Sequence, residues 1–256
     1  MIKVASSNIR FDNPKDGKHD WAGRRAVLST AINSFAPFIL GSQEGRREQL
    51  KDFESLLCDL DLIDSHRDWI SERMYPCLFY NQKIFNLVES GDIWLSETPF
   101  VPGSKSFGSA FPRLCTWATL ELKQHAKKLI CINVHLDHMK TETRQEQIKV
   151  LLKEIKSINI EGLPIILMGD FNEGPKEKVR EIINGSGLTL SDPWLNLKKD
   201  EDISHHGFEG QKEAAKRIDW ILSTREFSPI SVDLYKESIE GIFPSDHYPV
   251  FAEFKV

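Results

Sequence analysis

Short runs of apolar or β-branched residues recur along the whole chain and predict strands. Segments that stay apolar, or alternate with polar residues, over four to eight positions are typical of strands in sheets. We expect strands at residues 2–8, 38–42, 75–81, 84–89, 115–122, 129–136, 164–170, 217–223, 230–235 and 250–254. Residues 115–122 also show the period-two alternation of a strand that is buried on one face.

Apolar residues at three- and four-residue spacing predict helices at residues 23–35, 47–57, 141–157 and 176–184. In residues 141–157 an apolar stripe of Ile148, Leu151, Leu152 and Ile155 follows one side of the helix. Gly185 is expected to end the helix that begins at residue 176. Polar segments rich in turn-forming residues predict long loops at 10–21, 97–113 and 197–216, which fit functional loops and tolerated insertions equally well.

The order of these elements favours an α+β fold. Several strands follow one another without helices between them, and two adjacent sheets covered by helices would bury this amount of apolar strand. The length of 256 residues is compatible with one large domain or two small ones. Because no repeat, low-complexity block or linker divides the chain, we expect one domain spanning residues 1–256.

Composition and charge narrow the class of protein. Apolar residues make up 40% and charged residues 28%, which excludes a mostly disordered chain. The net charge of −5 argues against a protein that coats long nucleic acid with its whole surface, although a local basic pocket is compatible with it. With no membrane-length apolar run, no signal-peptide pattern, and four cysteines scattered without a Cys-x-x-Cys pair, we expect a cytoplasmic protein that has no membrane partner.

Polar side chains recur where apolar runs end, and they indicate a shared site. Asn8, Glu44, Asp170, Asn172 and Asp246 are all oxygen donors, which suit Mg²⁺, Mn²⁺ or Ca²⁺ better than structural zinc. Each of them alone also fits a turn former, a helix cap or a local backbone hydrogen bond. Burying several carboxylates in one region is costly unless they share a cation or hydrogen bonds, so their repetition favours a common site.

Two histidines and an aspartate add groups that can transfer protons or bind an anion. His247 follows Asp246 directly and titrates near neutral pH. His135 and Asp219 lie inside predicted strands, where a satisfied structural role is the competing interpretation.

The same segments form an ordered set of motifs. The set comprises Ser-Asn-Ile-Arg at residues 7–10, Gln-Glu at 43–44, Trp-Leu-Ser-Glu-Thr-Pro at 94–99, Asn-Val-His-Leu-Asp-His at 133–138, Gly-Asp-Phe-Asn at 169–172, Arg-Ile-Asp-Trp at 217–220 and Ser-Asp-His-Tyr-Pro-Val at 245–250. In this order, the set resembles the endonuclease/exonuclease/phosphatase superfamily. The resemblance implies a four-layer α/β/β/α sandwich of two packed mixed sheets flanked by helices, a divalent metal, usually Mg²⁺, and hydrolysis of phosphate esters.

The resemblance also implies roles for individual residues. Asn8 and Glu44 would hold the metal with Asp246 near it. Asp170 and Asn172 would position or activate the attacking water and contact the phosphoryl group. His247, oriented by Asp219, would polarise the phosphate or transfer a proton, and His135 would bind a phosphate oxygen.

Two departures from the family pattern bear on the substrate. Arg10 stands where the DNA-repair members carry an acidic residue, and His135 stands where those members carry tyrosine. The histidine resembles the deadenylase, phosphatase and DNase I-like branches, which argues against an AP-endonuclease role.

Four further residues are candidates for substrate binding. Arg113 and Arg144 offer planar guanidinium donors for a phosphate, although Arg144 fits a helix-surface position equally well. His206 lies in the loop at 197–216, where it is placed either to reach the substrate or on a flexible surface, and Tyr80 ends a predicted strand.

Together these features predict a Mg²⁺-dependent phosphoric ester hydrolase, with Mn²⁺ as a second candidate metal. The acidic balance and the absence of a basic stripe favour a small or short phosphorylated substrate, such as a phosphorylated small molecule, a nucleotide or a short nucleic acid. The alternatives are a DNA or RNA nuclease and a non-catalytic binding protein on the same fold. No obligate protein partner is evident.

Overall fold

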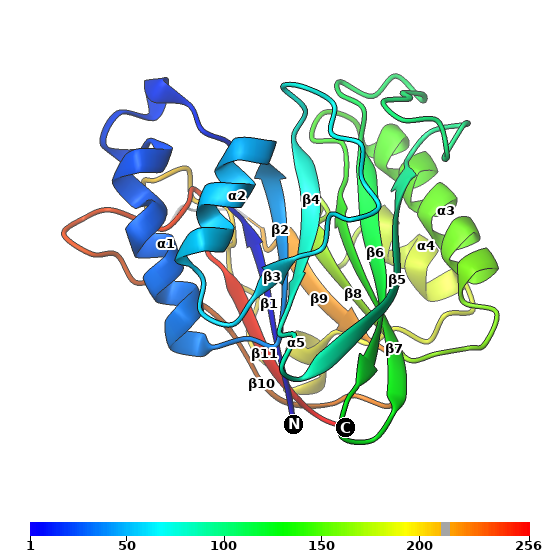
Figure 1. Ribbon diagram of the computed structural model, residues 1–256. Coiled ribbons are helices and arrows are strands. Elements are labelled where there is room, and N and C mark those ends of the chain that lie inside the picture. Colours follow the sequence, from blue (N-terminus) through cyan, green and yellow to red (C-terminus); the bar gives the residue numbers. More distant parts are fainter. Residues whose placement is uncertain (211–215) are drawn as a thin grey trace.

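Two β-sheets face each other between two layers of helices (Figure 1). The computed structural model describes residues 1–210 and 216–256, so part of the predicted loop at 197–216, residues 211–215, lies outside the described residues. The arrangement confirms the expected four-layer sandwich. No helix in the described ranges is long and apolar enough to cross a membrane.

The first sheet has six strands in the order β10-β11-β1-β2-β4-β3. Its strands are β1 (Ile2–Asn8), β2 (Ile39–Gly45), β3 (Asp61–Leu62), β4 (Tyr75–Tyr80), β10 (Ser228–Leu234) and β11 (Val250–Lys255). β1 and β2 are parallel and all other neighbours are antiparallel, which makes the sheet mixed.

The second sheet has five strands in the order β5-β6-β7-β8-β9. Its strands are β5 (Phe85–Trp94), β6 (Leu114–Leu122), β7 (Lys127–His135), β8 (Ile165–Asp170) and β9 (Asp219–Ser223). Only β7 and β8 run parallel to each other.

The helices cover the outer faces of the sheets because each presents an apolar side. The 3-10 helix η1 (Pro14–His19) leads into α1 (Trp21–Phe35), which with α2 (Arg47–Leu56) covers the first sheet. α3 (Thr141–Ile158) and α4 (Lys178–Gly185) cover the second sheet, and α5 (Pro193–Asn196) is a single turn. The stripe predicted on residues 141–157 is confirmed, since Ile148, Leu151, Leu152 and Ile155 are all buried in that core.

The alternation in β6 proves misleading, because the strand is buried on both faces. Cys115 and Trp117 pack in the core beneath α3, whereas Ala118 and Leu120 pack in the core between the sheets. The expectation of one solvated face is therefore wrong, and the reason is that a four-layer sandwich covers each sheet on both sides.

Three other details differ from the predictions. β5 continues to Trp94, five residues past the predicted end at 89, with a register shift between Leu87 and Glu89 that the apolar pattern does not reveal. η1, β3 and α5 are too short for periodicity to indicate. Gly185 is the last residue of α4, and Ser186 caps the helix.

Strand direction gathers the polar strand ends at one edge of the sandwich. Parallel pairing places the ends of β1 and β2 together, with Asn8 opposite Gln43, and likewise the ends of β7 and β8. Gly169 permits the close approach of β8, since its φ is 144° and a Cβ there would lie 2.0 Å from the carbonyl oxygen of Val134. The glycine of the Gly-Asp-Phe-Asn motif thereby sets the position of the aspartate that follows it.

Candidate active site

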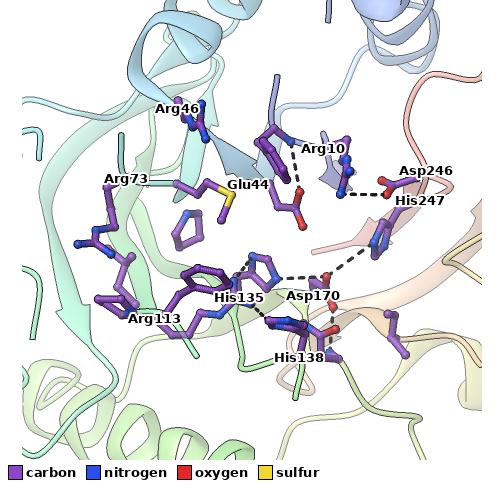
Figure 2. Close-up of a pocket in the computed structure, with 18 of the residues that line it drawn as sticks. Arg10, Glu44, Arg46, Arg73, Arg113, His135, His138, Asp170, Asp246 and His247 are labelled. Atoms are coloured by element: carbon purple, nitrogen blue, oxygen red, sulfur yellow. Dashed lines mark hydrogen bonds and ion pairs between the residues drawn. The ribbon is translucent and has the colours of Figure 1, made fainter. Parts of the chain in front are cut away.

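A pocket of about 460 Å³ opens at this edge and is lined from both sheets (Figure 2). Most of the residues singled out from the sequence line its wall, namely Glu44, Arg113, His135, Asp170, Asn172, Asp246 and His247. Asn8 and Asp219 do not line the wall but contact it from behind through hydrogen bonds to Asp170 and His247.

Strand register places three of these residues side by side. His135 on β7 is opposite Asp170 on β8, and Asp170 is opposite Asp219 on β9. His247 approaches from the segment before β11, and its Nδ1 donates to Asp219 Oδ2 at 2.8 Å. The Asp170 carboxylate consequently lies between two imidazoles, with His135 Nε2 at 3.5 Å and His247 Nε2 at 4.0 Å from Oδ2.

The two imidazoles have opposite protonation states. Burial opposes charge on His247, but the carboxylates of Asp219, Asp170 and Asp246 outweigh it and raise its pKa to about 10. Burial and the nearby Arg113 guanidinium lower the pKa of His135 well below its usual 6.5. At neutral pH His247 is therefore an imidazolium and His135 is neutral.

Arg113 also fixes which nitrogen of His135 carries the proton. Its NH1 group donates to His135 Nδ1 at 3.0 Å, so Nδ1 accepts and Nε2 holds the proton that points toward Asp170. Burial, and then the neighbouring Asp219, raise the pKa of Asp170 to about 7.

Asn8, Glu44 and Asp170 form a buried group of oxygen and amide atoms. Asn8 Nδ2 lies 3.3 Å from Glu44 Oε1 and 3.0 Å from Asp170 Oδ2, and the backbone N–H of Phe11 donates to Glu44 Oε2. Within the described part of the chain, no Lys, Arg or His nitrogen lies within 4 Å of the Glu44 carboxylate. The carboxylate oxygens of Glu44 and Asp170 fit a hard divalent cation, whereas Asn8 turns its amide nitrogen toward them and its Oδ1 toward the backbone N–H of Arg10.

The backbone at four pocket residues is left-handed although none of them is glycine. The φ values are 52° at Arg10, 69° at Glu44, 58° at Glu72 and 52° at Asn172. Such conformations persist only where surrounding contacts enforce them, and they gather at functional sites. Arg24, fully buried, supplies one of these contacts by donating to the carbonyl oxygens of Ile9 and Arg10 at 2.5 Å each.

Arg113 is a buried cation without a carboxylate partner. Its side chain is 7% exposed, its NH2 group donates to His138 Nδ1 at 3.1 Å, and its Nε has no acceptor. No carboxylate oxygen of the described residues lies within 4 Å of it. A buried guanidinium that is hydrogen-bonded only to neutral acceptors creates a strong position for an anion.

Asp246 is held as a carboxylate at the opposite side of the pocket. Burial opposes its charge, but His247 and Arg10 outweigh burial and keep its pKa below the usual value. Arg10 NH1 lies 3.8 Å from Asp246 Oδ2.

The structure does not bring the other three predicted substrate-binding residues to the pocket. The guanidinium of Arg144 is occupied by Glu173 Oε2 at 2.8 Å, by the carbonyl oxygen of Asp137 and by Thr141, which favours the structural interpretation. His206 is fully buried and stacks on Tyr248 at 4.0 Å between ring centroids.

Tyr80 lies at the wrong end of its strand. Because β4 is antiparallel to β2, its first residue Tyr75 pairs with Gly45 near the pocket, whereas Tyr80 pairs with Ile39 at the far end. The sequence indicated the strand but not its direction.

Among the residues that line the pocket, Arg46, Arg73 and His205 were not predicted candidates, and Arg10 was noted only as a departure from the family pattern. Arg46 lies two residues after Glu44, and His205 precedes the candidate His206, so proximity to a motif was the available signal. Arg73 comes from the segment between β3 and β4 and carries no such signal.

Two groups of the described His and Asp side chains lie close enough together to hold a metal ion. One consists of His205, Asp246 and His247, and the other of Asp170, Asp219 and His247. His205, Asp246, His247 and Asp170 line the pocket, and Asp219 contacts it from behind. The candidate metal ligands therefore lie in the same pocket as Arg113.

Comparison with known proteins agrees with this geometry. Residues 5–247 match the model of the Endonuclease/Exonuclease/phosphatase family. Among solved structures, a mannosyl-6-phosphatase of Bacteroides thetaiotaomicron VPI-5482 is 28% identical, with all of both chains covered and a TM-score of 0.90. A family protein from Bacteroides vulgatus is 27% identical, with 100% and 98% of the chains covered and a TM-score of 0.92.

A curated relative is more distant. Nocturnin of Rattus norvegicus is 25% identical, and the match covers 97% of this chain but only 63% of the relative. The chain thus spans somewhat less than two thirds of the length of that relative. From the family model and the shared architecture, the chain belongs to the endonuclease/exonuclease/phosphatase family, whose members are hydrolases acting on phosphate esters.

Proposed function

We propose that the protein is a Mg²⁺-dependent phosphatase that removes the phosphoryl group from a small phosphorylated molecule of the sugar phosphate class. The observation that carries this proposal is the buried Arg113 guanidinium, which has no carboxylate oxygen within 4 Å among the described residues and adjoins the Asp170 carboxylate through His135. A phosphoryl group is an anion that a guanidinium binds through two parallel hydrogen bonds. The pocket therefore offers an anion position next to a group that can act on water.

The metal fits the oxygen-rich side of the same pocket. Glu44 would hold Mg²⁺, because it is a carboxylate without a cationic partner within 4 Å in the described ranges. Asn8 would join it through its Oδ1 oxygen, which accepts from the backbone N–H of Arg10. When bound, the ion supplies positive charge that stabilises the charge developing on phosphoryl oxygens. Glu44 and Asn8 would thus bind the metal ion, and other residues would transfer the proton.

Asp170 is suited to orient the attacking water and to accept its proton. Burial and Asp219 raise its pKa to about 7, and a carboxylate in that range is a stronger base than an ordinary one. Asn172 holds it in place, since its backbone N–H donates to Asp170 Oδ1 at 2.9 Å. The water would approach from the pocket side, where Asp170 is accessible to a ligand.

The two histidines complete the anion site as donors. His247, held as an imidazolium by Asp219, directs its Nε2–H group toward the pocket, and His135 directs its own Nε2–H group there from the other side. Donors already aligned before the reaction stabilise the charge that develops on a phosphoryl oxygen without reorganising.

The preference for a sugar phosphate rests on the chain's charge and on one relative. A net charge of −5 does not attract a long polyanion. The mannosyl-6-phosphatase shares 28% of its residues over the full length of both chains. We propose that residues 1–256 act as a single domain and that the protein is cytoplasmic.

Substrate profiling tests the proposal directly. Wild-type protein with Mg²⁺ is given hexose phosphates, p-nitrophenyl phosphate, bis-p-nitrophenyl phosphate and labelled single- and double-stranded oligonucleotides. We expect release of inorganic phosphate from the monoesters, lost in Asp170→Asn and retained in Asp233→Asn, an exposed control. Cleavage of the diester or the oligonucleotides without monoester turnover would overturn the proposal in favour of a nuclease.

A further inference from the structure

A second pocket of about 550 Å³ adjoins the candidate active site. The two pockets share a wall made by Arg46, Glu72 and Arg73, and Arg46 forms an ion pair with Glu72 at 3.4 Å. Figure 2 shows Arg46 and Arg73 at the rim away from His247. A ligand held at Arg113 that extends past these side chains would reach the second pocket.

The second pocket has the chemistry of a site for a polyhydroxylated group. Trp69 supplies aromatic surface, and Asp12 supplies a carboxylate. Gln49 and Asp52 also line the pocket but are already engaged, Gln49 with the backbone of Asp12 and Arg10, and Asp52 with Trp21 and Arg25. The Asp12 side chain is exposed and accepts no hydrogen bond from the other described residues. Aromatic faces next to carboxylates match the two sides of a sugar ring, which has apolar C–H faces and a rim of hydroxyl donors.

The wall of the second pocket is held in place by a buried network. Arg67, two residues before Trp69, donates to Asp92 on β5 through Nε and NH2 at 2.7 Å each, and to Thr116 on β6 at 2.7 Å. The Arg67 guanidinium also lies 4.8 Å from the centre of the Trp69 ring. The segment between β3 and β4 is therefore fixed to the second sheet, and the pocket is formed before any ligand binds.

We infer that the second pocket binds a further sugar unit of the substrate, so that the preferred substrate is a phosphorylated disaccharide or longer glycan rather than a free hexose phosphate. This inference rests on the proposed phosphatase function. The phosphorylated sugar lies in the first pocket, and the sugar linked to it passes the Arg46–Glu72 pair to contact Trp69 and Asp12.

The charges around the second pocket favour a glycan over a nucleic acid strand. Carboxylates of Asp12, Glu48, Asp52 and Glu72 line it beside the arginines. The lining carries four carboxylates and three guanidinium groups, so it lacks the excess of positive charge that a chain of phosphates needs. A neutral sugar can instead donate a hydroxyl hydrogen to the Asp12 carboxylate.

The test compares two substrates that differ by one neutral sugar. Steady-state hydrolysis is measured for a hexose 6-phosphate and for the disaccharide in which the same 6-phosphorylated hexose carries a second hexose. We expect the wild-type kcat/KM to be about tenfold higher for the disaccharide, through a lower KM, because burying about 55 Å² of apolar surface corresponds to one factor of ten. Equal values for the two substrates would overturn the inference and leave the proposed function intact.

Variants locate the effect. Trp69→Ala should abolish the preference for the disaccharide while leaving hydrolysis of the hexose phosphate unchanged. Because Trp69 also packs on Tyr75, Ser71→Trp serves as a second variant that fills the pocket from an exposed position. Phe100→Ala, which changes an exposed aromatic side chain outside both pockets, is the control.

The remaining outcomes are distinguishable. If the wild-type protein hydrolyses no phosphomonoester at all, the proposed function fails together with the inference. If both pocket variants weaken oligonucleotide cleavage and leave the disaccharide preference unaltered, the second pocket is a nucleic acid site and the inference is overturned.

Discussion

Replacing Asp219 with asparagine tests whether the charge on His247 is needed for turnover. Asp219 Oδ2 is the nearest carboxylate oxygen to His247, 2.8 Å from Nδ1, and both side chains are buried. Raising the pKa of His247 from 6.5 to about 10 corresponds to roughly 5 kcal/mol in favour of the imidazolium. Asp219 shares this effect with Asp170 and Asp246, so we assign about half of it, or roughly 2–3 kcal/mol, to Asp219.

The expected result is a loss of activity that depends on pH. In Asp219→Asn the loss of roughly 2–3 kcal/mol lowers the pKa of His247 from about 10 to about 8, so the imidazolium is lost above about pH 8 and turnover drops about twentyfold at about pH 9.5. The wild-type protein should stay active on the alkaline side up to about pH 9. The assay is kcat and kcat/KM for p-nitrophenyl phosphate with Mg²⁺, measured from about pH 5.5 to about pH 9.5. Because the imidazolium returns as pH falls below about 8, the turnover of the variant relative to the wild type should recover there.

The Asp219–His247 pair also makes the free energy of unfolding depend on pH. The folded-state pKa of His247 lies above its unfolded value, so its contribution to the free energy of unfolding is fully present below pH 6.5 and is lost as pH rises through about 10. Urea denaturation at acidic and alkaline pH should show this loss in the wild-type protein and a smaller one in Asp219→Asn.

An alkaline limb that is identical in wild type and Asp219→Asn would refute the reasoning. Such a result would mean that Asp219 does not control the charge on His247, or that turnover does not require that charge. Asp233→Asn, a carboxylate-to-amide change at an exposed residue that does not line the pocket, should leave the profile unaltered.

Three further predictions follow from named contacts. Arg113→Gln should lower kcat/KM for a phosphomonoester by roughly 10- to 150-fold in steady-state assays, because a charge-assisted hydrogen bond contributes about 1.5–3 kcal/mol; an unchanged value would remove Arg113 from the anion site. Mg²⁺ at about 100 times its Kd should stabilise the wild-type protein by about 2.7 kcal/mol in thermal melts, and Glu44→Gln should lose most of that gain; equal gains would place the metal elsewhere. Arg144→Met should cost about 3–5 kcal/mol in urea denaturation by leaving Glu173 buried without its partner, with KM unchanged; a raised KM in a stable variant would restore Arg144 to substrate binding.

Much of the site could be predicted from the sequence because its residues follow strand ends. Asn8, Glu44 and Asp170 each come at the end of an apolar run, and parallel pairing of β1 with β2 and of β7 with β8 brings such ends to one edge. The apolar patterns also predicted the long helices and nearly all of the longer strands, since these elements bury one side or both sides in a core.

Other features depended on contacts between segments that are far apart in the sequence. Because β4 runs antiparallel to β2, Tyr80 lies at the end of the strand that is remote from the pocket. The guanidinium of Arg144 binds Glu173 and does not line the pocket. Arg73 lines the pocket, and it belongs to the segment between β3 and β4 that Arg67 fixes to the second sheet. None of these outcomes is encoded in a local pattern.

The sequence by itself determined the longer elements and the chemical types at their ends, because periodicity and strand-end residues are local properties. Its motifs implied the four-layer class through a family resemblance. Only the tertiary structure decided the protonation of the two histidines and the pairing of the cations. Those properties follow from burial and from short distances between residues that are far apart in the sequence. Arg113 and His135, for example, lie 22 positions apart and 3.0 Å from each other, and His135 lies 3.5 Å from Asp170. Electrostatic energy depends on distance in space and on exclusion of water, and the order of residues along the chain specifies neither of them directly.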